Sequence, residues 1–173
     1  MTILPRLPAS FRLPIAVVVH LAKERQSRLA EVFQNHMAIP VHEAADKEDI
    51  CSGTLYFAPT DYHLSIESDH SFSLSGEPPI HFSRPAIDIL MESAAAAYGA
   101  TLVGILLTGA NIDGARGMQA IQQHGGLTIV QEPGEAQIVT MPQAAINLMQ
   151  PDFILPLREI HTLLLHLDKQ YAS

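Results

Sequence analysis

Apolar residues in this sequence occur in two kinds of segment: short continuous runs and longer stretches with helical spacing. Residues 102–107 form a run without a polar residue, which predicts a parallel strand covered on both faces. Residues 108–111 interrupt the run, and Gly125 and Gly126 end the helix expected to follow. The apolar stripe of that helix consists of Ala115, Met118 and Ile121.

The remaining pattern predicts further strands that alternate with helices. We expect Ser83 and Thr140 to cap two of these helices, with Pro85 and Pro142 in their first turns. Such alternation indicates an α/β protein with three layers, α/β/α, in which a mainly parallel, doubly wound sheet carries one inserted β-hairpin. The predicted strands are 15–19, 39–43, 54–58, 127–131 and 153–155, the hairpin is 63–67 with 71–74, and the helices are 24–37, 83–98, 140–149 and 157–167.

Composition and charge narrow the classes of protein. The chain has 173 residues, enough for one well-packed domain, and its net charge of −8 argues against a nucleic-acid partner. The single Cys forms no disulfide within the chain. No apolar run is long enough to insert into a membrane, and the N-terminus lacks the pattern of a signal peptide. We therefore expect a cytoplasmic protein.

Two polar residues follow predicted parallel strands. His20 comes after strand 15–19, and Asp113 follows strand 102–107, within or just before the next helix. The carboxyl ends of parallel strands meet at one edge of a sheet, where ligands bind. A His paired with a carboxylate is the base half of a hydrolytic triad. The alternatives are ordinary ones, since a His at a strand end is more often structural and an Asp at a helix start is most often a cap.

The sequence offers no clear nucleophile or metal site to accompany this pair. There is no G-x-S-x-G elbow, Ser27 lies within a predicted helix, and Cys51 has no basic neighbour in sequence. His20, His63 and His81 lack the spacing of a zinc enzyme. We therefore expect no metal and no cofactor, and we leave a hydrolase using Ser27 or Cys51 as a minor alternative.

Five segments in a fixed order carry a stronger signal. They are VVVHLAKERQSRLAEVF (17–33), GTLYFAPTDYHL (53–64), HFSRPAIDILMES (81–93), GILLTGANIDGARGM (104–118) and VQEPGEAQIVTMPQAAI (130–146). In these segments the chain resembles the catalytic domain of CheB-type chemotaxis protein-glutamate methylesterases. The resemblance covers nearly the whole chain.

The resemblance implies an activity and a set of site residues. His20 would be the general base, Asp113 would orient it, and the backbone N–H of Ala110 would face the oxyanion. The family hydrolyses γ-glutamyl methyl esters, and in many members deamidates glutamines, on methyl-accepting chemoreceptor proteins during chemotaxis adaptation. No cofactor or metal is implied.

The sequence also departs from the family pattern. The family's first strand, its G-x-S-[TA]-G-G loop with the nucleophilic serine, and its receiver domain have no counterpart here. We therefore expect a single, N-terminally truncated domain over residues 1–173, its first strand missing, inactive without the serine. Loss of a central strand would expose sheet edges, so we expect poor stability or a homodimer that covers them. The alternative is a pseudoenzyme, a non-catalytic module that docks on receptors or signalling partners.

Overall fold

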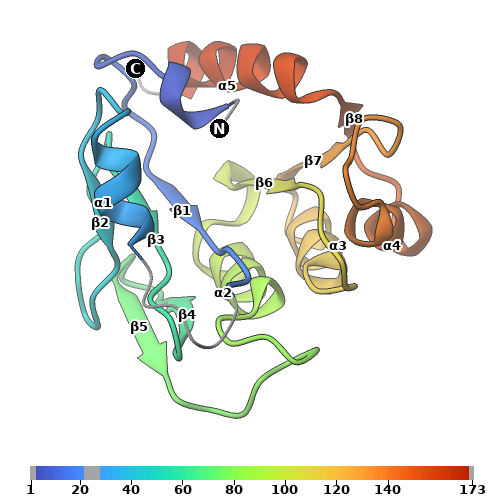
Figure 1. Ribbon diagram of the computed structural model, residues 1–173, viewed down its shortest axis with the longest axis horizontal. Coiled ribbons are helices and arrows are strands. Elements are labelled where there is room, and N and C mark those ends of the chain that lie inside the picture. The colour runs from blue at the N-terminus through green and yellow to red at the C-terminus, as the bar shows by residue number, and fades with distance from the viewer. Residues whose placement is uncertain (1–2, 22–27, 172–173) are drawn as a thin grey trace.

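The parallel strands of the protein form two three-stranded sheets. A computed structural model describes residues 3–21 and 28–171. The first sheet has the order β1 (Ile15–Val17), β3 (Leu55–Phe57), β2 (Val41–Glu43), and the second has β6 (Val103–Leu106), β7 (Leu127–Gln131), β8 (Phe153–Leu155). Every neighbouring pair in both sheets is parallel. This arrangement confirms the predicted α/β class (Figure 1).

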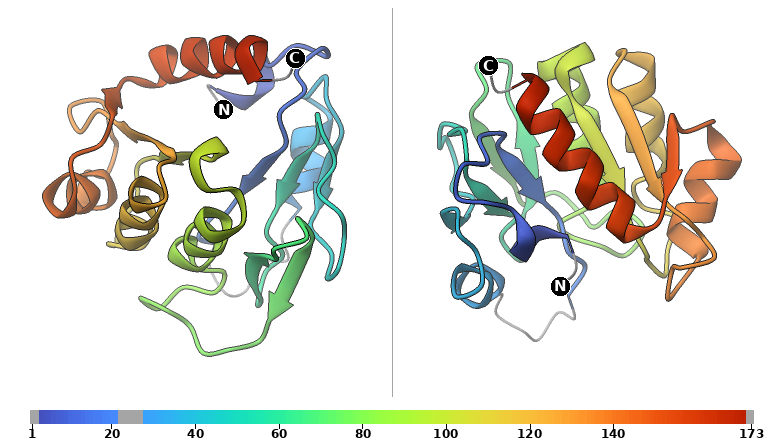
Figure 2. Two further views of the ribbon diagram at one scale, coloured as in Figure 1. Left: turned by 180° about the vertical axis from the view of Figure 1, so that it is seen from behind. Right: turned by 90° about the horizontal axis from the view of Figure 1, so that it is seen from above.

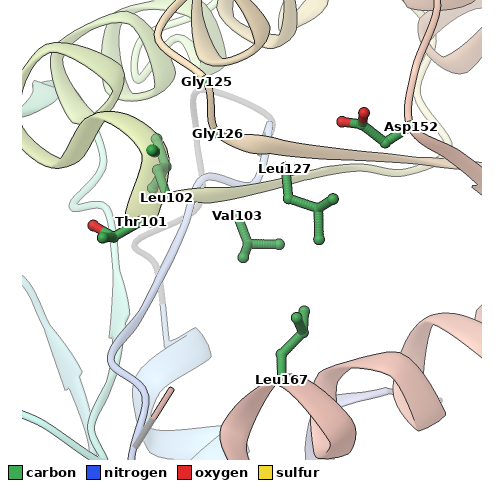
Figure 3. A pocket seen from close by; sticks show the side chains of 9 residues that line it. Thr101, Leu102, Val103, Gly125, Gly126, Leu127, Asp152 and Leu167 are labelled. Carbon is green, nitrogen blue, oxygen red and sulfur yellow. The ribbon is translucent and has the colours of Figure 1, made fainter. Parts of the chain in front are cut away.

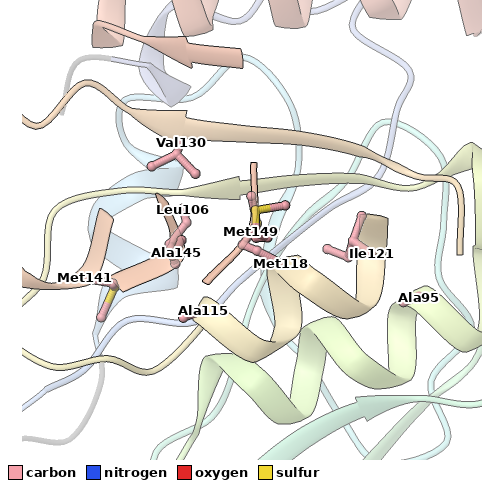
Figure 4. Close-up of a cluster of buried hydrophobic side chains, with 9 residues drawn as sticks. All are labelled: Ala95, Leu106, Ala115, Met118, Ile121, Val130, Met141, Ala145 and Met149. Atoms are coloured by element: carbon pink, nitrogen blue, oxygen red, sulfur yellow. The ribbon is translucent and has the colours of Figure 1, made fainter. Parts of the chain in front are cut away.

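Helices cover both faces of the second sheet. Ile129 and Val130, adjacent on β7, are both fully buried, because Ile129 faces α5 (Leu157–Tyr171) while Val130 faces α3 (Ala115–Gln123) and α4 (Thr140–Leu148). Figure 4 shows the cluster on the side of α3 and α4, to which α2 (Ile87–Tyr98) contributes Ala95. A strand covered on both faces needs no polar alternation, which explains the apolar run of β6, whose residues are buried on one face and half-buried on the other.

The other elements surround the first sheet. The hairpin packs with β3 and α2 in an apolar cluster that contains Tyr56, Phe72 and Leu90. A second cluster joins the first sheet to Leu165 of α5. The remaining elements are a 3₁₀ turn η1 (Leu4–Arg6), α1 (Leu29–Gln34), the antiparallel hairpin β4 (His63–Ile66) and β5 (Phe72–Ser75), and η2 (Gly99–Thr101).

No backbone ladder joins the two sheets in the part of the chain that the structure describes. Among the described residues, β1 pairs only with β3 and β6 pairs only with β7. The free edges of β1 and β6 lie on the facing sides of the two sheets, as Figures 1 and 2 show. The sequence predicts a sheet without its first strand. In the structure the parallel strands are divided between β1 and β6.

Two predicted helix caps are wrong. Ser83 lies in a tight turn, where it exchanges backbone hydrogen bonds with Ile80, and α2 begins only at Ile87. Thr140 is the first residue of α4 rather than its cap. Part of the helix predicted over 24–37 lies outside the described residues, and its described part, α1, ends at Gln34.

Candidate functional site

His20 and Asp113 meet at the carboxyl edge of the parallel strands. His20 follows β1 of one sheet, and Asp113 follows β6 of the other. The Nε2 atom of His20 lies 2.8 Å from Oδ2 of Asp113, in a hydrogen bond that the imidazole donates. The Asp113 side chain is fully buried, whereas that of His20 is 24% exposed. The carboxylate is therefore shielded from water while the imidazole remains accessible.

Asp113 also caps a helix other than its own. Its Oδ2 accepts a hydrogen bond from the backbone N–H of Ile87 at 2.6 Å, and its Oδ1 accepts one from Asp88 at 2.9 Å. These two N–H groups belong to the first turn of α2, whose preceding residues give no side-chain cap. The Asp113 carboxylate thus caps α2, the role that the sequence analysis predicts for Ser83, although Asp113 lies more than twenty residues further along the chain.

These contacts hold the carboxyl group of Asp113 in its ionised form. Burial acts to raise its pKa. The hydrogen bond from His20, followed by those from Asp88 and Ile87, outweighs burial and lowers the pKa below its usual value. An ionised, buried Asp113 can stabilise a positive imidazolium on His20.

The same hydrogen bond decides which nitrogen of His20 can act as a base. Because Nε2 carries the proton shared with Asp113, Nδ1 is left with its lone pair. Within the described part of the chain, Nδ1 has no hydrogen-bond partner. It is thus free to accept a proton from a molecule that enters the site.

The loop between β6 and α3 places backbone N–H groups near the pair. Gly109 donates its N–H to Ile138 and accepts one from Met141, which fixes the loop against the start of α4. The N–H of Asp113 is held by the side chain of Asn111. Ala110 lies exposed between these anchors, and its N–H has no partner among the described residues. It can therefore donate to a ligand, as a donor toward an oxyanion must.

Comparison with known proteins identifies the origin of this arrangement. A family model described as CheB methylesterase matches residues 1–164. The chain belongs to the CheB methylesterase family. Its fold matches the crystal structure of the CheB methylesterase catalytic domain of Thermotoga maritima with a TM-score of 0.90 and 31% identity, over 96% of this chain and 89% of that one.

Sequence relatives agree with the structural match. A relative from Leptospira interrogans, described as "putative protein-glutamate methylesterase/protein-glutamine glutaminase", is 43% identical over 168 residues, which cover 97% of this chain and 87% of the relative. A protein-glutamate methylesterase/protein-glutamine glutaminase from Trichodesmium erythraeum is 37% identical over 161 residues. That alignment covers 91% of this chain and only 46% of the relative.

The described part of this CheB family member supplies no nucleophile at His20. No hydroxyl or thiol among the described residues bonds to the imidazole. Ser27 lies outside the described residues. Ser83 accepts a hydrogen bond from Asn111, and the Cys51 thiol points to the carbonyl of Asp49.

The histidines considered as metal ligands have other contacts. His63 is buried, accepts the N–H of Ala86 on Nδ1, and donates from Nε2 to the carbonyl of Pro78. His81 lies 3.9 Å from a carboxylate oxygen of Asp88. Within the described ranges, no three His, Cys, Asp or Glu residues are grouped to hold a metal ion.

A separate cavity lies at the opposite edge of the second sheet. It has a volume of ≈210 Å³ and is lined by η2, the amino ends of β6 and β7, and Leu167 of α5. Val103, Leu127 and Leu167 point into it from opposite sides (Figure 3). Because it opens at the amino ends of the strands, it is not part of the site formed by His20 and Asp113.

No helix in the described ranges is both long and apolar enough to span a membrane.

Proposed function

We propose that this chain takes part in the hydrolysis of γ-glutamyl methyl esters, and in the deamidation of glutamines, on methyl-accepting chemoreceptor proteins. The relatives named above are described as enzymes of these two activities. The observation that carries the proposal is the 2.8 Å hydrogen bond between His20 and the buried Asp113. The proposed setting is the cytoplasm, as expected from the sequence.

In the proposed reaction, His20 moves protons through Nδ1. Nδ1 accepts the proton of an attacking hydroxyl as its oxygen bonds to the ester carbon, and Asp113 stabilises the resulting imidazolium. The carbonyl oxygen becomes an oxyanion that accepts the N–H of Ala110. The imidazolium then returns its proton to the leaving methoxide, which departs as methanol. With an amide substrate, ammonia departs instead. In both cases the acyl group is left on the attacking oxygen; water then attacks it, Nδ1 of His20 takes the proton of the water and returns it to that oxygen, and the glutamate carboxylate is released.

The attacking hydroxyl is the part of the proposal that this sequence does not supply. A serine on a G-x-S-x-G-G loop would be its source by resemblance, and no such segment occurs in the 173 residues. We therefore predict little or no turnover by this chain alone. Receptor binding without turnover would favour the non-catalytic module.

A gain-of-function experiment tests the proposal. A strand followed by a G-x-S-x-G-G segment is fused upstream of Met1, and methanol released from methylated receptor is measured. The fused protein is expected to release methanol, and His20→Ala in that background is expected to lower the rate by about 10²- to 10⁴-fold, the usual contribution of a general base. A folded fusion that releases no methanol would contradict the proposal. Ser52→Ala, which alters an exposed hydroxyl bonded to the carbonyl of Arg12, serves as a control.

A further inference from the structure

The helices α2 and α3 are capped reciprocally, each by a carboxylate near the amino end of the other. Asp113, just before α3, accepts the N–H groups of Ile87 and Asp88 at the start of α2. In return, Oδ1 of Asp88 accepts the N–H of Gly114 at 2.9 Å and that of Gly117 at 2.7 Å, at the start of α3. Each helix is thus capped by an acidic residue that lies at, or just before, the start of the other.

This reciprocal capping brings the carboxyl groups of Asp88 and Asp113 close together in the interior of the protein. The Asp88 side chain is 4% exposed; its Oδ2 is buried without a hydrogen-bond partner among the described residues and lies 3.9 Å from Nε2 of His81. Burial raises the pKa of Asp88, the two N–H donors from Gly117 and Gly114 oppose that rise, and the charge of Asp113 adds to it. A second carboxylate beside Asp113 is costly, so its presence calls for a role that outweighs the cost.

The contacts of Asp88 indicate that role. Its side chain holds the backbone of Gly114, the residue directly after Asp113, where φ is 97°. Its own N–H holds Oδ1 of Asp113. Asp88 therefore holds the loop between β6 and α3 from two sides, while Oδ2 of Asp113 binds His20.

We propose that Asp88 is a positioning residue of the site, which sets the orientation of Asp113 and, through it, of the His20 imidazole. Asp88 touches neither His20 nor any reacting atom in this arrangement, and it acts only through Asp113. Asp88 lies in the segment 81–93 that carries the family resemblance, but nothing in that segment separates this role from that of an ordinary acidic residue in the first turn of a helix, where acidic residues are common.

The proton on Nε2 of His20 reports this positioning directly. In protein labelled with ¹⁵N-histidine, His20→Gln identifies its signal, and exchange of the Nε2 proton with water is measured by NMR. We expect Asp88→Ala to speed exchange by about tenfold or more, as for loss of one hydrogen bond. Asp88→Asn keeps an acceptor oxygen without the charge, so we expect an intermediate acceleration of roughly threefold.

A matched control separates positioning from general loss of stability. Asp152 likewise accepts two hydrogen bonds, from the backbone and side chain of Thr128, but at the amino edge of the sheet. Asp152→Asn and Asp152→Ala are expected to leave the His20 exchange rate unchanged at equal fractions of folded protein. If Asp88→Ala does not fold, the comparison of Asp88→Asn with Asp152→Asn decides.

Two results would overturn the inference. One is an exchange rate in Asp88→Asn equal to that of the wild type, and the other is equal acceleration by the variants at Asp88 and Asp152. The inference rests on the proposed function only in taking His20 and Asp113 as the site. Because proton exchange needs no turnover, failure of this test and failure of the methylesterase test are separate results.

Discussion

Three sets of contacts converge on the buried residue Asp113. It binds His20, it caps α2 through Ile87 and Asp88, and its own N–H is held by Asn111. A buried charge is tolerated only when donors surround it, and here three N–H groups do so. The residue at the centre of the site is therefore also important for packing, and its replacement should affect stability as well as activity.

Asp113→Asn is expected to destabilise the protein by about 1–3 kcal/mol at pH 7. The amide group puts N–H donors where Oδ2 or Oδ1 accepts, so at least one donor from His20, Ile87 or Asp88 loses its partner. Urea unfolding of the variant and the wild type measures the difference.

This difference should depend on pH in a definite direction. The fold lowers the pKa of Asp113, so its ionised form contributes stability above the unfolded value of about 3.9. That contribution is lost as the pH falls through the lower pKa of the folded state. The gap between wild type and Asp113→Asn should therefore narrow below about pH 4. A gap that stays constant from pH 7 to pH 3 would contradict this account.

At the level of elements, the sequence predicts the strands well and the start of α2 poorly. Strands β7 and β8 have the predicted bounds, because an apolar run between turn residues is a local signal. The start of α2 depends on Asp113, which no local pattern around Ser83 reveals. His20 and Asp113 each follow a predicted strand, so the sequence could place both at one edge of the sheet. The contact of Asp88 with the loop of Asp113 is long-range, so the sequence could not reveal it.

Close packing of α2 on α3 gives a prediction at Gly117. A Cβ atom added there would lie 2.5 Å from Cβ of Met91, which no rotation of the Met91 side chain can relieve. Alanine favours a helix over glycine by about 1 kcal/mol, but the overlap costs about 1–3 kcal/mol and also disturbs an N–H held by Asp88.

We therefore expect Gly117→Ala to lower the free energy of unfolding, by up to about 2 kcal/mol. Gly134→Ala is the control, because nothing lies within 4 Å of an added Cβ there. Thermal or urea unfolding of both variants makes the comparison. A Gly117→Ala protein as stable as Gly134→Ala would show that α2 and α3 separate without cost.

For the whole molecule, the site is a bridge between the two sheets. His20 extends from the sheet of β1, and Asp113 from the sheet of β6. In the described residues no backbone ladder joins these sheets, so their relation depends on packing around α2 and α5 and on the bond between His20 and Asp113. Loss of this bond should loosen the two halves of the molecule.

The free edges of β1 and β6 give the last prediction, which is self-association. Ile15 and Val17 bond to the chain around β3, so the alternate residue Ala16 directs its N–H to the free edge. An unpaired edge is a template for another strand. We expect light scattering to show a dimer whose fraction rises with protein concentration. The fraction should be larger at high salt, because salt screens the repulsion between copies that each carry a net charge of −8.

Ala16→Pro removes the donor at this edge without removing a bond to β3, and should shift the equilibrium toward the monomer. Glu43→Pro is the matched control on β2, the opposite edge of the same sheet. Pro40 and Ala44 bond to β3, so Glu43 directs its N–H away from it. If association persists equally in both variants, the edge of β1 is not the contact. A wild-type protein that remains a stable monomer with little binding of an apolar dye would show that the free edges are already protected.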